Sequence, residues 1–364
     1  MKLQVTQENL HKALTNVAKV ANSRGTLPIL ANILIKTVGN RVCIAATNLD
    51  IAITQYIGSK VTTEGSITVP ARLMQDFVAS LSPSTVITLE LDGTKLKVTT
   101  EHHHSTINGT SAEDYPVMPA ISDGNTLPIA AKHLKTGLQQ ALLAASADEA
   151  RPVLTAVNIH TNDGKLYLVA TDSYRLAERS LGKQREDVSL LVPASALHDL
   201  LRVLGDVDED VQVTYDDQQV LFKLSDVELV PRLIEGNYPE YRKLIPTSFA
   251  HTAILPKKEL QDITKVSSLF ARENAGSVSI NLNETTQEIS IQAVASQLGE
   301  NTASTEAKVS SEGNITLNSR YILDALGVIE GSEVMVGFNE KLEPCVFKST
   351  RHDDYTHVIM PLKS

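Results

Sequence analysis

The sequence predicts an α+β protein that consists of three similar domains in tandem. The main observation is a triplicated segment: ITVPARLMQDFVASL, LLVPASALHDLLRVL and ITLNSRYILDALGVI begin at Ile67, Leu190 and Ile315, so neighbouring copies lie about 124 residues apart. Two further sets of similar segments repeat at the same spacing. A chain of 364 residues is also too long for one ordinary core and suits two or three domains. Three agreeing signals at one period indicate that one unit has been triplicated.

Each repeat is expected to contain two helices. Every copy of the triplicated segment couples a short β-branched or leucine-rich strand to a stretch opened by Pro or Asn, in which apolar residues recur at helical spacing. A second set, ENLHKALTNV, KHLKTGLQQA and KELQDITKVS, places Leu10, Leu134 and Leu260 equivalently. The periodicity predicts six helices, at residues 7–20, 70–81, 130–146, 193–204, 256–270 and 319–329.

Strands are expected to fill the rest of each repeat. IAATNLDIAIT from Ile44 resembles LVATDSYRLAE from Leu168 and, more weakly, IQAVASQLGEN from Ile291. VNIHTNDGKLYLVAT and VSINLNETTQEISIQAV each show two alternating apolar runs joined by a polar turn, which is typical of a β-hairpin. Polar turn residues near 122–126 and 247–251 separate the repeats. We therefore expect three domains, at residues 1–123, 124–248 and 249–364.

The composition is that of a folded globular protein, with 42% apolar and 21% charged residues. No apolar run approaches the roughly 18 residues that a membrane helix needs, and the first residues lack the apolar stretch and cleavage site of a signal peptide. We expect a soluble cytoplasmic protein without a membrane partner. Cys43 and Cys345 both lie in apolar alternating runs, so we expect them to be reduced and buried.

Charge is distributed unevenly along the chain. The formal net charge is −10, yet the six predicted helices hold ten Lys or Arg against six Asp or Glu. For any single helix the ordinary explanation is a solvated face, but the excess recurs in equivalent helices. The basic residues that flank the apolar stripes are Lys12, Lys19, Arg72, Lys132, Lys135, Arg202, Lys258, Lys265 and Arg320.

A ring would explain this segregation. If the domains close head to tail with their helices inside, the basic faces meet the phosphates of a duplex and the acidic exterior repels nucleic acid. Such binding is directed at the DNA backbone and is independent of sequence. Aromatic residues make up only 4% of the chain and Trp is absent, so stacking platforms for single strands are poorly supplied. Duplex DNA is therefore the expected ligand.

Motifs for catalysis or metal binding are missing from the sequence. It contains no GxxxxGK[ST] loop, no GxGxxG, no GxSxG and no CxxC. Three consecutive histidines, residues 102–104, point to alternate faces of a strand and cannot converge on one metal ion. The acidic run at 206–210 lacks the glycine and the terminal glutamate of a calcium loop. We expect no catalytic residue, no metal and no cofactor. The alternative to a DNA ring is a scaffold of three β-rich domains.

The C-terminus is unusually apolar for a chain end. Residues 356–364 read THVIMPLKS. One interpretation is a last edge strand whose side chains complete a core, and the other is an exposed landing site for a partner.

Several motifs resemble those of one family. They are TLPIL at 26–30, ITVPAR at 67–72, ATDSYRLA at 170–177, GNYPEYRKLIP at 236–246 and VIMPL at 358–362. With these motifs the chain resembles the bacterial sliding clamps, the beta subunits of DNA polymerase III, over its full length and in all three repeats. The resemblance implies the DNA clamp fold: a head-to-tail homodimer whose six domains form a ring with inner helices and outer β-sheets.

The resemblance also implies a role and partners. A sliding clamp is a non-catalytic processivity factor that encircles duplex DNA and tethers the replicative polymerase. The implied partners are the DNA polymerase III alpha subunit, the clamp loader and other proteins with QLxLF-type motifs, which bind a shallow hydrophobic groove. The residues implied for this groove are Leu154, Thr171, Ser173, Tyr174, Arg175, Leu176, Pro239, Lys243, Leu244, Asn318, Tyr321, Pro344, Val358, Met360, Pro361 and Leu362.

The chain departs from the family pattern at some of these positions. Ser173 and Tyr174 stand where the family often has Gly and His, and Lys243 stands where many members have Arg. For DNA binding, the resemblance adds Arg24 to the helix residues. For the subunit contact it implies Leu269, Phe270 and Ile107, the last because Ser105 replaces a common aromatic residue.

Overall fold

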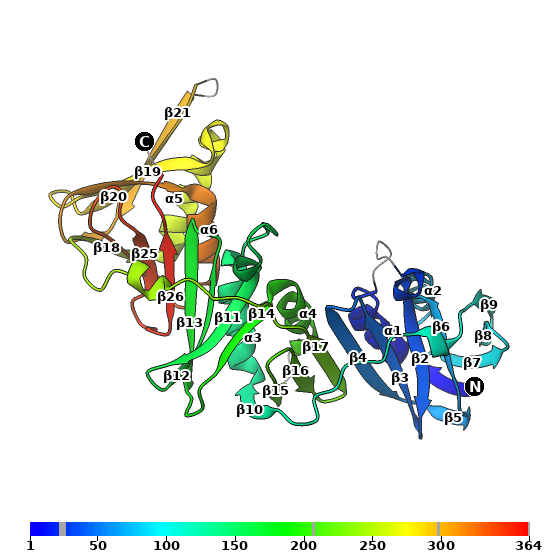
Figure 1. Ribbon diagram of the computed structural model, residues 1–364. Coiled ribbons are helices and arrows are strands. Elements are labelled where there is room, and N and C mark those ends of the chain that lie inside the picture. Colours follow the sequence, from blue (N-terminus) through cyan, green and yellow to red (C-terminus); the bar gives the residue numbers. More distant parts are fainter. Residues whose placement is uncertain (22–26, 206–207, 297–298, 363–364) are drawn as a thin grey trace. The chain divides into compact units, whose positions relative to one another are not determined.

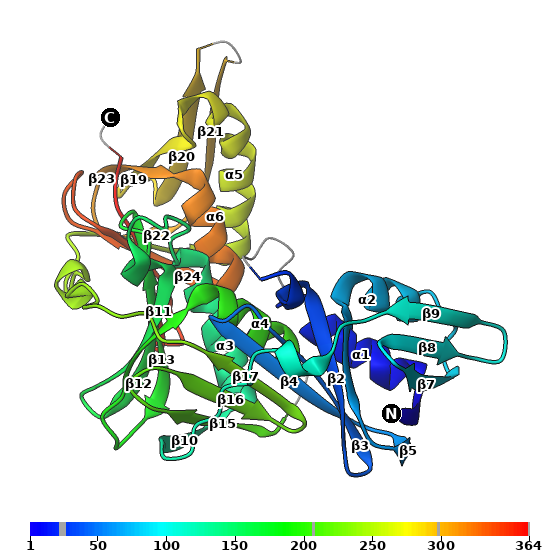
Figure 2. The ribbon, with the colours of Figure 1, turned by 45° about the vertical axis from the view of Figure 1, so that its right-hand side comes forward.

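The structure, a computed structural model, describes residues 1–21, 27–205, 208–296 and 299–362 (Figures 1 and 2). The chain forms two compact units. Unit 1 joins Met1–Lys132 to Ser195–Leu233, and unit 2 joins His133–Ala194 to Ile234–Ser364. The middle repeat therefore contributes to both units.

All six predicted helices are confirmed. They are α1 (Gln7–Val17), α2 (Ala71–Ala79), α3 (Ala131–Ala141), α4 (Ala194–Leu204), α5 (Lys257–Phe270) and α6 (Ser319–Val328). The prolines predicted at the helix starts lie one position outside: Pro70 and Pro256 are N-caps, where their fixed φ directs the chain into the first turn. α3 is shorter than predicted because the chain tightens into a 3-10 turn at Leu142–Ala144. No helix of the described ranges is long and apolar enough to cross a membrane.

Unit 1 contains two antiparallel sheets. The first has five strands in the order β5 (Lys60–Thr63), β1 (Lys2–Thr6), β7 (Val86–Asp92), β8 (Lys95–Thr99) and β9 (His104–Asn108). The second has eight strands in the order β10 (Asn125–Ala130), β15 (Asp210–Tyr215), β16 (Val220–Leu224), β17 (Val227–Pro231), β4 (Ile51–Gly58), β3 (Arg41–Thr47), β2 (Asn32–Val38) and β6 (Ser66–Pro70).

Unit 2 repeats this design. Its nine-stranded sheet runs β14 (Ser189–Pro193), β11 (Ala156–Asn162), β12 (Lys165–Thr171), β13 (Arg175–Lys183), β26 (Tyr355–Ile359), β25 (Cys345–Ser349), β24 (Glu333–Phe338), β18 (His251–Pro256) and β22 (Lys308–Val309). Its four-stranded sheet runs β21 (Gly299–Glu306), β20 (Glu288–Ala295), β19 (Ser277–Asn283) and β23 (Gly313–Asn318). The two predicted hairpins are confirmed as β11–β12 and β19–β20.

Each large sheet consists of two half-sheets that come from different repeats. In unit 1 they join where β17 pairs with β4, and Val230 lies opposite Ala52. In unit 2 they join where β13 pairs with β26, and Val358 lies opposite Leu176. The same junction therefore forms twice within one chain.

The helices cover the sheets with their apolar faces. In α1 the predicted stripe of Leu10, Leu14 and Val17 is fully buried. In α5 two polar residues are buried as well, and both are hydrogen-bonded: the Thr264 hydroxyl donates to the Leu260 carbonyl at 2.6 Å, and the Ser267 hydroxyl to Asn301 at 2.9 Å. Both cysteines are free thiols in buried positions, as expected.

Candidate partner-docking site

The C-terminal residues have two different roles. β26 is an interior strand between β13 and β25, so the interpretation of these residues as a last edge strand is wrong. Val358 and Ile359 are almost completely buried and complete a core. Beyond the strand, residues 360–362 are half-buried at the surface of unit 2. The N–H of Met360 donates to the Tyr174 carbonyl at 2.8 Å, and the N–H of Leu362 donates to the Thr316 carbonyl at 2.9 Å.

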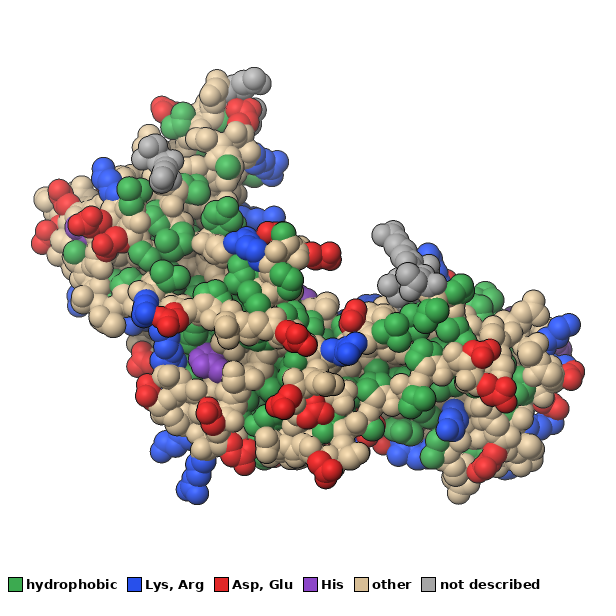
Figure 3. Space-filling view, in the orientation of Figure 1, with side chains coloured by type: hydrophobic (Ala, Val, Ile, Leu, Met, Phe, Trp, Pro, Cys, Tyr) green, Lys and Arg blue, Asp and Glu red, His purple; other side chains and the backbone are tan. Residues whose placement is uncertain are grey.

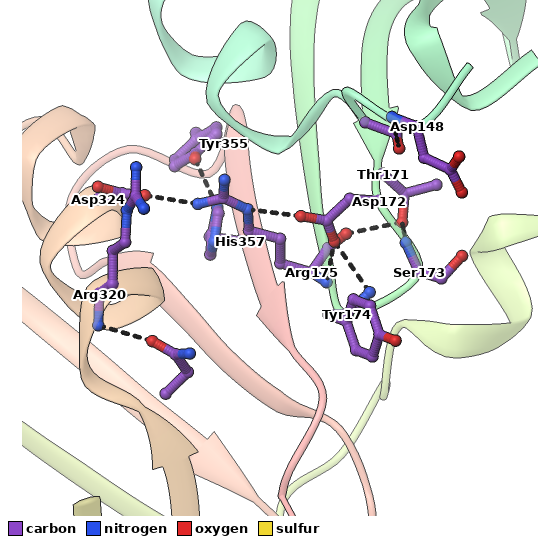
Figure 4. Close-up of polar contacts among 12 residues, drawn as sticks. Asp148, Thr171, Asp172, Ser173, Tyr174, Arg175, Arg320, Asp324, Tyr355 and His357 are labelled. Atoms are coloured by element: carbon purple, nitrogen blue, oxygen red, sulfur yellow. Dashed lines mark hydrogen bonds and ion pairs between the residues drawn. The ribbon is translucent and has the colours of Figure 1, made fainter. Parts of the chain in front are cut away.

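The turn between β12 and β13 is fixed by its own side chains (Figure 4). The Asp172 carboxylate accepts from the backbone N–H groups of Tyr174 and Arg175, at 2.9 and 3.0 Å. The Thr171 hydroxyl accepts from the N–H of Ser173 and donates to the Arg175 carbonyl. Ser173 has φ +78°, a conformation that glycine adopts more easily. The turn holds the Tyr174 side chain outward, 60% exposed.

Arg175 connects this turn to the third repeat. Its guanidinium forms ion pairs with Asp172 at 3.0 Å and with Asp324 of α6 at 2.6 Å, and it lies 4.4 Å from the centroid of the Tyr321 ring. The Arg175 side chain is only 12% exposed. Because both carboxylates already neutralise it, Arg175 positions the neighbouring residues and does not offer a free charge to a partner. Tyr355 and His357 lie beside this network in Figure 4.

An apolar cluster forms the floor below the turn. It contains Leu176 and Val358, which the resemblance implied, together with Val169, Val346 and Tyr241, with Tyr167, Tyr238, Ile245 and Phe249 packed around them. The Tyr241 hydroxyl donates to Glu178 at 2.5 Å and lies 3.1 Å from His160 Nε2. Burial and the hydrogen bond to Glu178 raise the pKa of Tyr241, which stays protonated.

Tyr241 anchors the segment that carries three of the implied groove residues. Pro239, Lys243 and Leu244 flank it in the sequence, and Leu244 is 47% exposed. Lys243 forms an exposed ion pair with Glu240. Tyr238 and Tyr241 were not predicted as supporting residues, although both belong to the GNYPEYRKLIP motif.

The remaining implied residues surround this area. Leu154 and Thr171 are buried. Asn318 caps α6 by accepting from the N–H of Arg320 at 2.9 Å, and Pro344 directly precedes β25. We call the whole set the C-terminal face: Leu154, Thr171, Ser173, Tyr174, Arg175, Leu176, Pro239, Lys243, Leu244, Asn318, Tyr321, Pro344, Val358, Met360, Pro361 and Leu362.

The basic helix residues differ in their exposure and in whether they form ion pairs. Lys12, Lys132, Lys258 and Lys265 are exposed, and within the described residues none of them has a carboxylate at ion-pair distance. Among the others, Arg72 pairs with Asp76, Arg202 pairs with Asp199, Lys135 is half-buried, and Arg24 lies outside the described residues. Acidic side chains are spread over both units on the face shown in Figure 3.

The residues implied for the subunit contact also differ. Leu269 is 49% exposed and Phe270 is half-buried, whereas the Ile107 side chain is 4% exposed and packs into its own domain. Only the backbone of Ile107 is placed at a sheet edge. Two further apolar helix residues are exposed and were not predicted, Leu73 of α2 and Val266 of α5.

Comparison with known proteins places the chain in one family. It matches the family models for the N-terminal, central and C-terminal domains of the DNA polymerase III beta subunit at residues 1–119, 128–240 and 242–363. It is 29% identical to the beta sliding clamp of Staphylococcus epidermidis over the full length of both chains. The crystal structure of the Bacillus subtilis DNA polymerase sliding clamp is similar, with a TM-score of 0.95 and 28% identity over 100% of this chain and 99% of that one. The Bartonella birtlesii clamp, solved with bound griselimycin, has a TM-score of 0.95 and 25% identity over 100% of both chains. The chain therefore belongs to the DNA polymerase III beta subunit family, the bacterial sliding clamps.

Proposed function

We propose that two copies of the chain close head to tail into a ring that encircles duplex DNA, and that the C-terminal face tethers the polymerase to it. The observation that carries this proposal is a pair of unjoined half-sheets. In the described part of the chain, β9 ends the five-stranded sheet and β21 ends the four-stranded sheet, and neither has a partner on its outer side. A third junction, between β9 of one copy and β21 of its partner, would satisfy both edges.

The internal repeats assign the strands of this third junction. β9 follows β7 and β8 in the first repeat as β17 follows β15 and β16 in the second and β26 follows β24 and β25 in the third. β21 likewise follows β20 as β4 follows β3 and β13 follows β12. The two junctions inside the chain therefore provide the template for the one between copies.

The template also predicts the register. Pro231 opposite Ile51 and Ile359 opposite Arg175 correspond to Ile107 opposite Gly299 of the partner. Three residues along, His104 lies opposite Thr302. The buried side chain of Ile107 agrees with this assignment, because Pro231 and Ile359 are also buried beside their junctions.

The helices support the same arrangement. In unit 1, Lys19, which lies two residues after the end of α1, interacts electrostatically with Asp199 of α4. In unit 2, the Gln140 amide of α3 donates to the Val328 carbonyl of α6 at 2.9 Å. The corresponding helix contact between copies would involve α5 of one copy and α2 of its partner. This contact would cover the exposed apolar residues Leu73, Val266 and Leu269, together with Phe270.

Duplex DNA would be held through its phosphates. Lys12, Lys132, Lys258 and Lys265 have the exposure that sequence-independent contacts need, with Arg72, Lys135, Arg202 and Arg24 as further candidates. Weak contacts that exchange quickly let a closed ring slide, and the linkage of ring and DNA supplies processivity. The site of action would be the cytoplasm, on chromosomal DNA.

The C-terminal face would bind QLxLF-type segments of the polymerase alpha subunit, the clamp loader and other partners. Leu176, Val358 and Leu154 supply the floor, while Tyr174, Leu244 and Met360 supply adaptable walls. A leucine and an aromatic anchor contribute about 1.5–3 kcal/mol each when buried, and after ordering losses this corresponds to roughly micromolar binding that permits exchange. The griselimycin complex of the Bartonella clamp supports a ligand-binding site in the family.

The proposal is tested by trapping the third junction. His104→Cys combined with Thr302→Cys should yield covalent dimers under mild oxidation, and these should stay on closed circular DNA but leave it after linearisation. A control with Thr106→Cys and Thr302→Cys is out of register and should cross-link poorly. Monomers in solution, or equal retention on linear and circular DNA, would contradict the ring.

A further inference from the structure

Unit 1 has a pocket at the place that a tyrosine fills in unit 2. The pocket encloses about 480 Å³ and lies on the eight-stranded sheet, beside the chain segment of residues 112–120. Side chains of β2, β3, β4 and β17 form its base. It does not belong to the C-terminal face, which is part of unit 2.

The strand registers identify the equivalent place in unit 2. Lys36 pairs with Cys43 as His160 pairs with Tyr167, and the Tyr-Pro pair at 115–116 corresponds to the pair at 238–239. Five pocket residues can be matched to residues of unit 2 in this way. Lys36 corresponds to His160, Cys43 to Tyr167, Ala52 to Leu176, Thr54 to Glu178 and Met118 to Tyr241.

Smaller side chains leave the unit 1 site hollow. In unit 2 the Tyr241 ring is 4% exposed and fills the site together with Tyr167 and Leu176. In unit 1, Cys43 and Ala52 stand at the positions of Tyr167 and Leu176. Met118 stands at the position of Tyr241 and does not fill the pocket.

We propose that this pocket binds an aromatic side chain carried by an extended, acidic segment of a partner protein. Tyr241 in unit 2 shows which group fits a site of this backbone geometry. Its hydroxyl is held there by Glu178 and His160. Thr54 and Lys36 stand at those two positions in the pocket and can hydrogen-bond a tyrosine hydroxyl in the same way.

The charges around the pocket favour a partner segment that is acidic. Glu228 is paired with Lys223 at 2.8 Å, and Arg41 on the neighbouring strand is paired with Asp226. In contrast, no carboxylate of the described ranges lies at ion-pair distance from Lys36. An acidic residue next to the aromatic anchor would supply this missing partner.

The proposal can be tested with a peptide that copies the segment around Tyr241, which fills the equivalent site in unit 2. The probe is a fluorescein-labelled Gly-Pro-Glu-Tyr-Gly peptide, and its binding to the full-length protein is followed by fluorescence anisotropy. Cys43→Tyr combined with Ala52→Leu puts the unit 2 side chains into the pocket, and we expect at least about a tenfold loss of affinity, as for removal of one buried anchor. Replacing the tyrosine of the probe by alanine should have the same effect.

Lys36→Gln tests the charge. It should weaken binding of the glutamate probe by about two- to threefold, in the range of an exposed ion pair, and leave a glutamine version of the probe unaffected. If the double variant is destabilised in a melting experiment, Ala52→Leu alone gives the decisive measurement. A second readout is alkylation of Cys43, which saturating probe should slow while Cys345 is unaffected.

Deletion of residues 360–364 separates this pocket from the C-terminal face. The truncated protein should bind the probe with unchanged affinity even where it no longer binds a QLxLF-type peptide. Loss of the probe on truncation, or unchanged binding to the variant with the filled pocket, would overturn the inference without affecting the proposed clamp function.

Discussion

The N–H of Met360 donates to the carbonyl oxygen of Tyr174 at 2.8 Å, which joins the C-terminal tail to the turn between β12 and β13. This bond continues the pairing of β13 with β26 by one residue past the end of β26. The tail is therefore positioned by the sheet, while its half-buried side chains remain at the surface. Removal of such a segment should disturb the packing of the core only slightly.

Deletion of residues 360–364 should separate partner binding from folding. We expect a folded dimer that binds a QLxLF-type peptide at least about 2 kcal/mol more weakly, because the peptide can no longer bury its anchors against the apolar side chains of the tail. Peptide affinity is measured by fluorescence anisotropy and the melting temperature by calorimetry. As a matched control, Val358→Ala truncates a buried core residue and should lower the melting temperature more than the deletion does. Full peptide affinity after the deletion would return these residues to a purely structural role.

Leu269→Ala combined with Phe270→Ala should produce folded monomers. These residues end α5 where the partner's α2 is expected, and in a head-to-tail dimer the substitutions weaken both interfaces at once. Sedimentation at micromolar concentration distinguishes monomer from dimer. Leu342→Ala, which changes another exposed apolar residue, should leave the dimer intact. An intact dimer in the double variant would contradict the assigned interface.

Charge reversal on the helices should weaken retention on DNA. We expect Lys12→Glu, Lys132→Glu and Lys265→Glu together to shorten the residence of the ring on closed circles and to flatten its salt dependence, by roughly one unit of slope for each phosphate that is no longer neutralised. The matched control reverses three exposed lysines on strands, Lys60, Lys183 and Lys308, and changes the net charge equally. Equal decreases in retention in both variants would mean that net charge, and not a basic channel, governs retention.

Local features of the fold were predictable from the sequence because their signals are local. Helical spacing located all six helices, and alternation located both hairpins. The joining of half-sheets from different repeats was not predictable from local patterns. It depends on backbone hydrogen bonds such as those between β17 and β4, which leave no local pattern in the side chains.

The same distinction applies to the candidate site. Apolar residues of the C-terminal face could be named from family motifs, but the ion pair of Arg175 with Asp324 could not, because Asp324 lies 149 positions away in the sequence. Likewise, the burial of Ile107 depends on which face of β9 points into the core, and that face is set by pairing with β8.

A pH-dependent loss of stability is expected from His357. Its side chain is fully buried, and its Nδ1 lies 2.9 Å from the Tyr355 hydroxyl. Its Nε2 has no hydrogen-bond partner among the residues that the structure describes. Burial, together with the positive charge of Arg175, lowers the pKa of His357 to about 3.

The sign of the effect follows from comparing the folded and unfolded states. In the unfolded chain His357 titrates near pH 6.5, so between that pH and about 3 the unfolded state binds one more proton. The free energy of unfolding is therefore unaffected above pH 6.5 and falls as the pH decreases through this window, by about 2 kcal/mol at pH 5. Burial lowers the pKa of His160 too, with the same sign, so only a comparison of variants isolates His357. His357→Gln should be less stable than the parent at pH 7, yet its urea midpoint should fall less between pH 7 and pH 5. Equal falls in the two proteins would show that His357 is already protonated in the folded state.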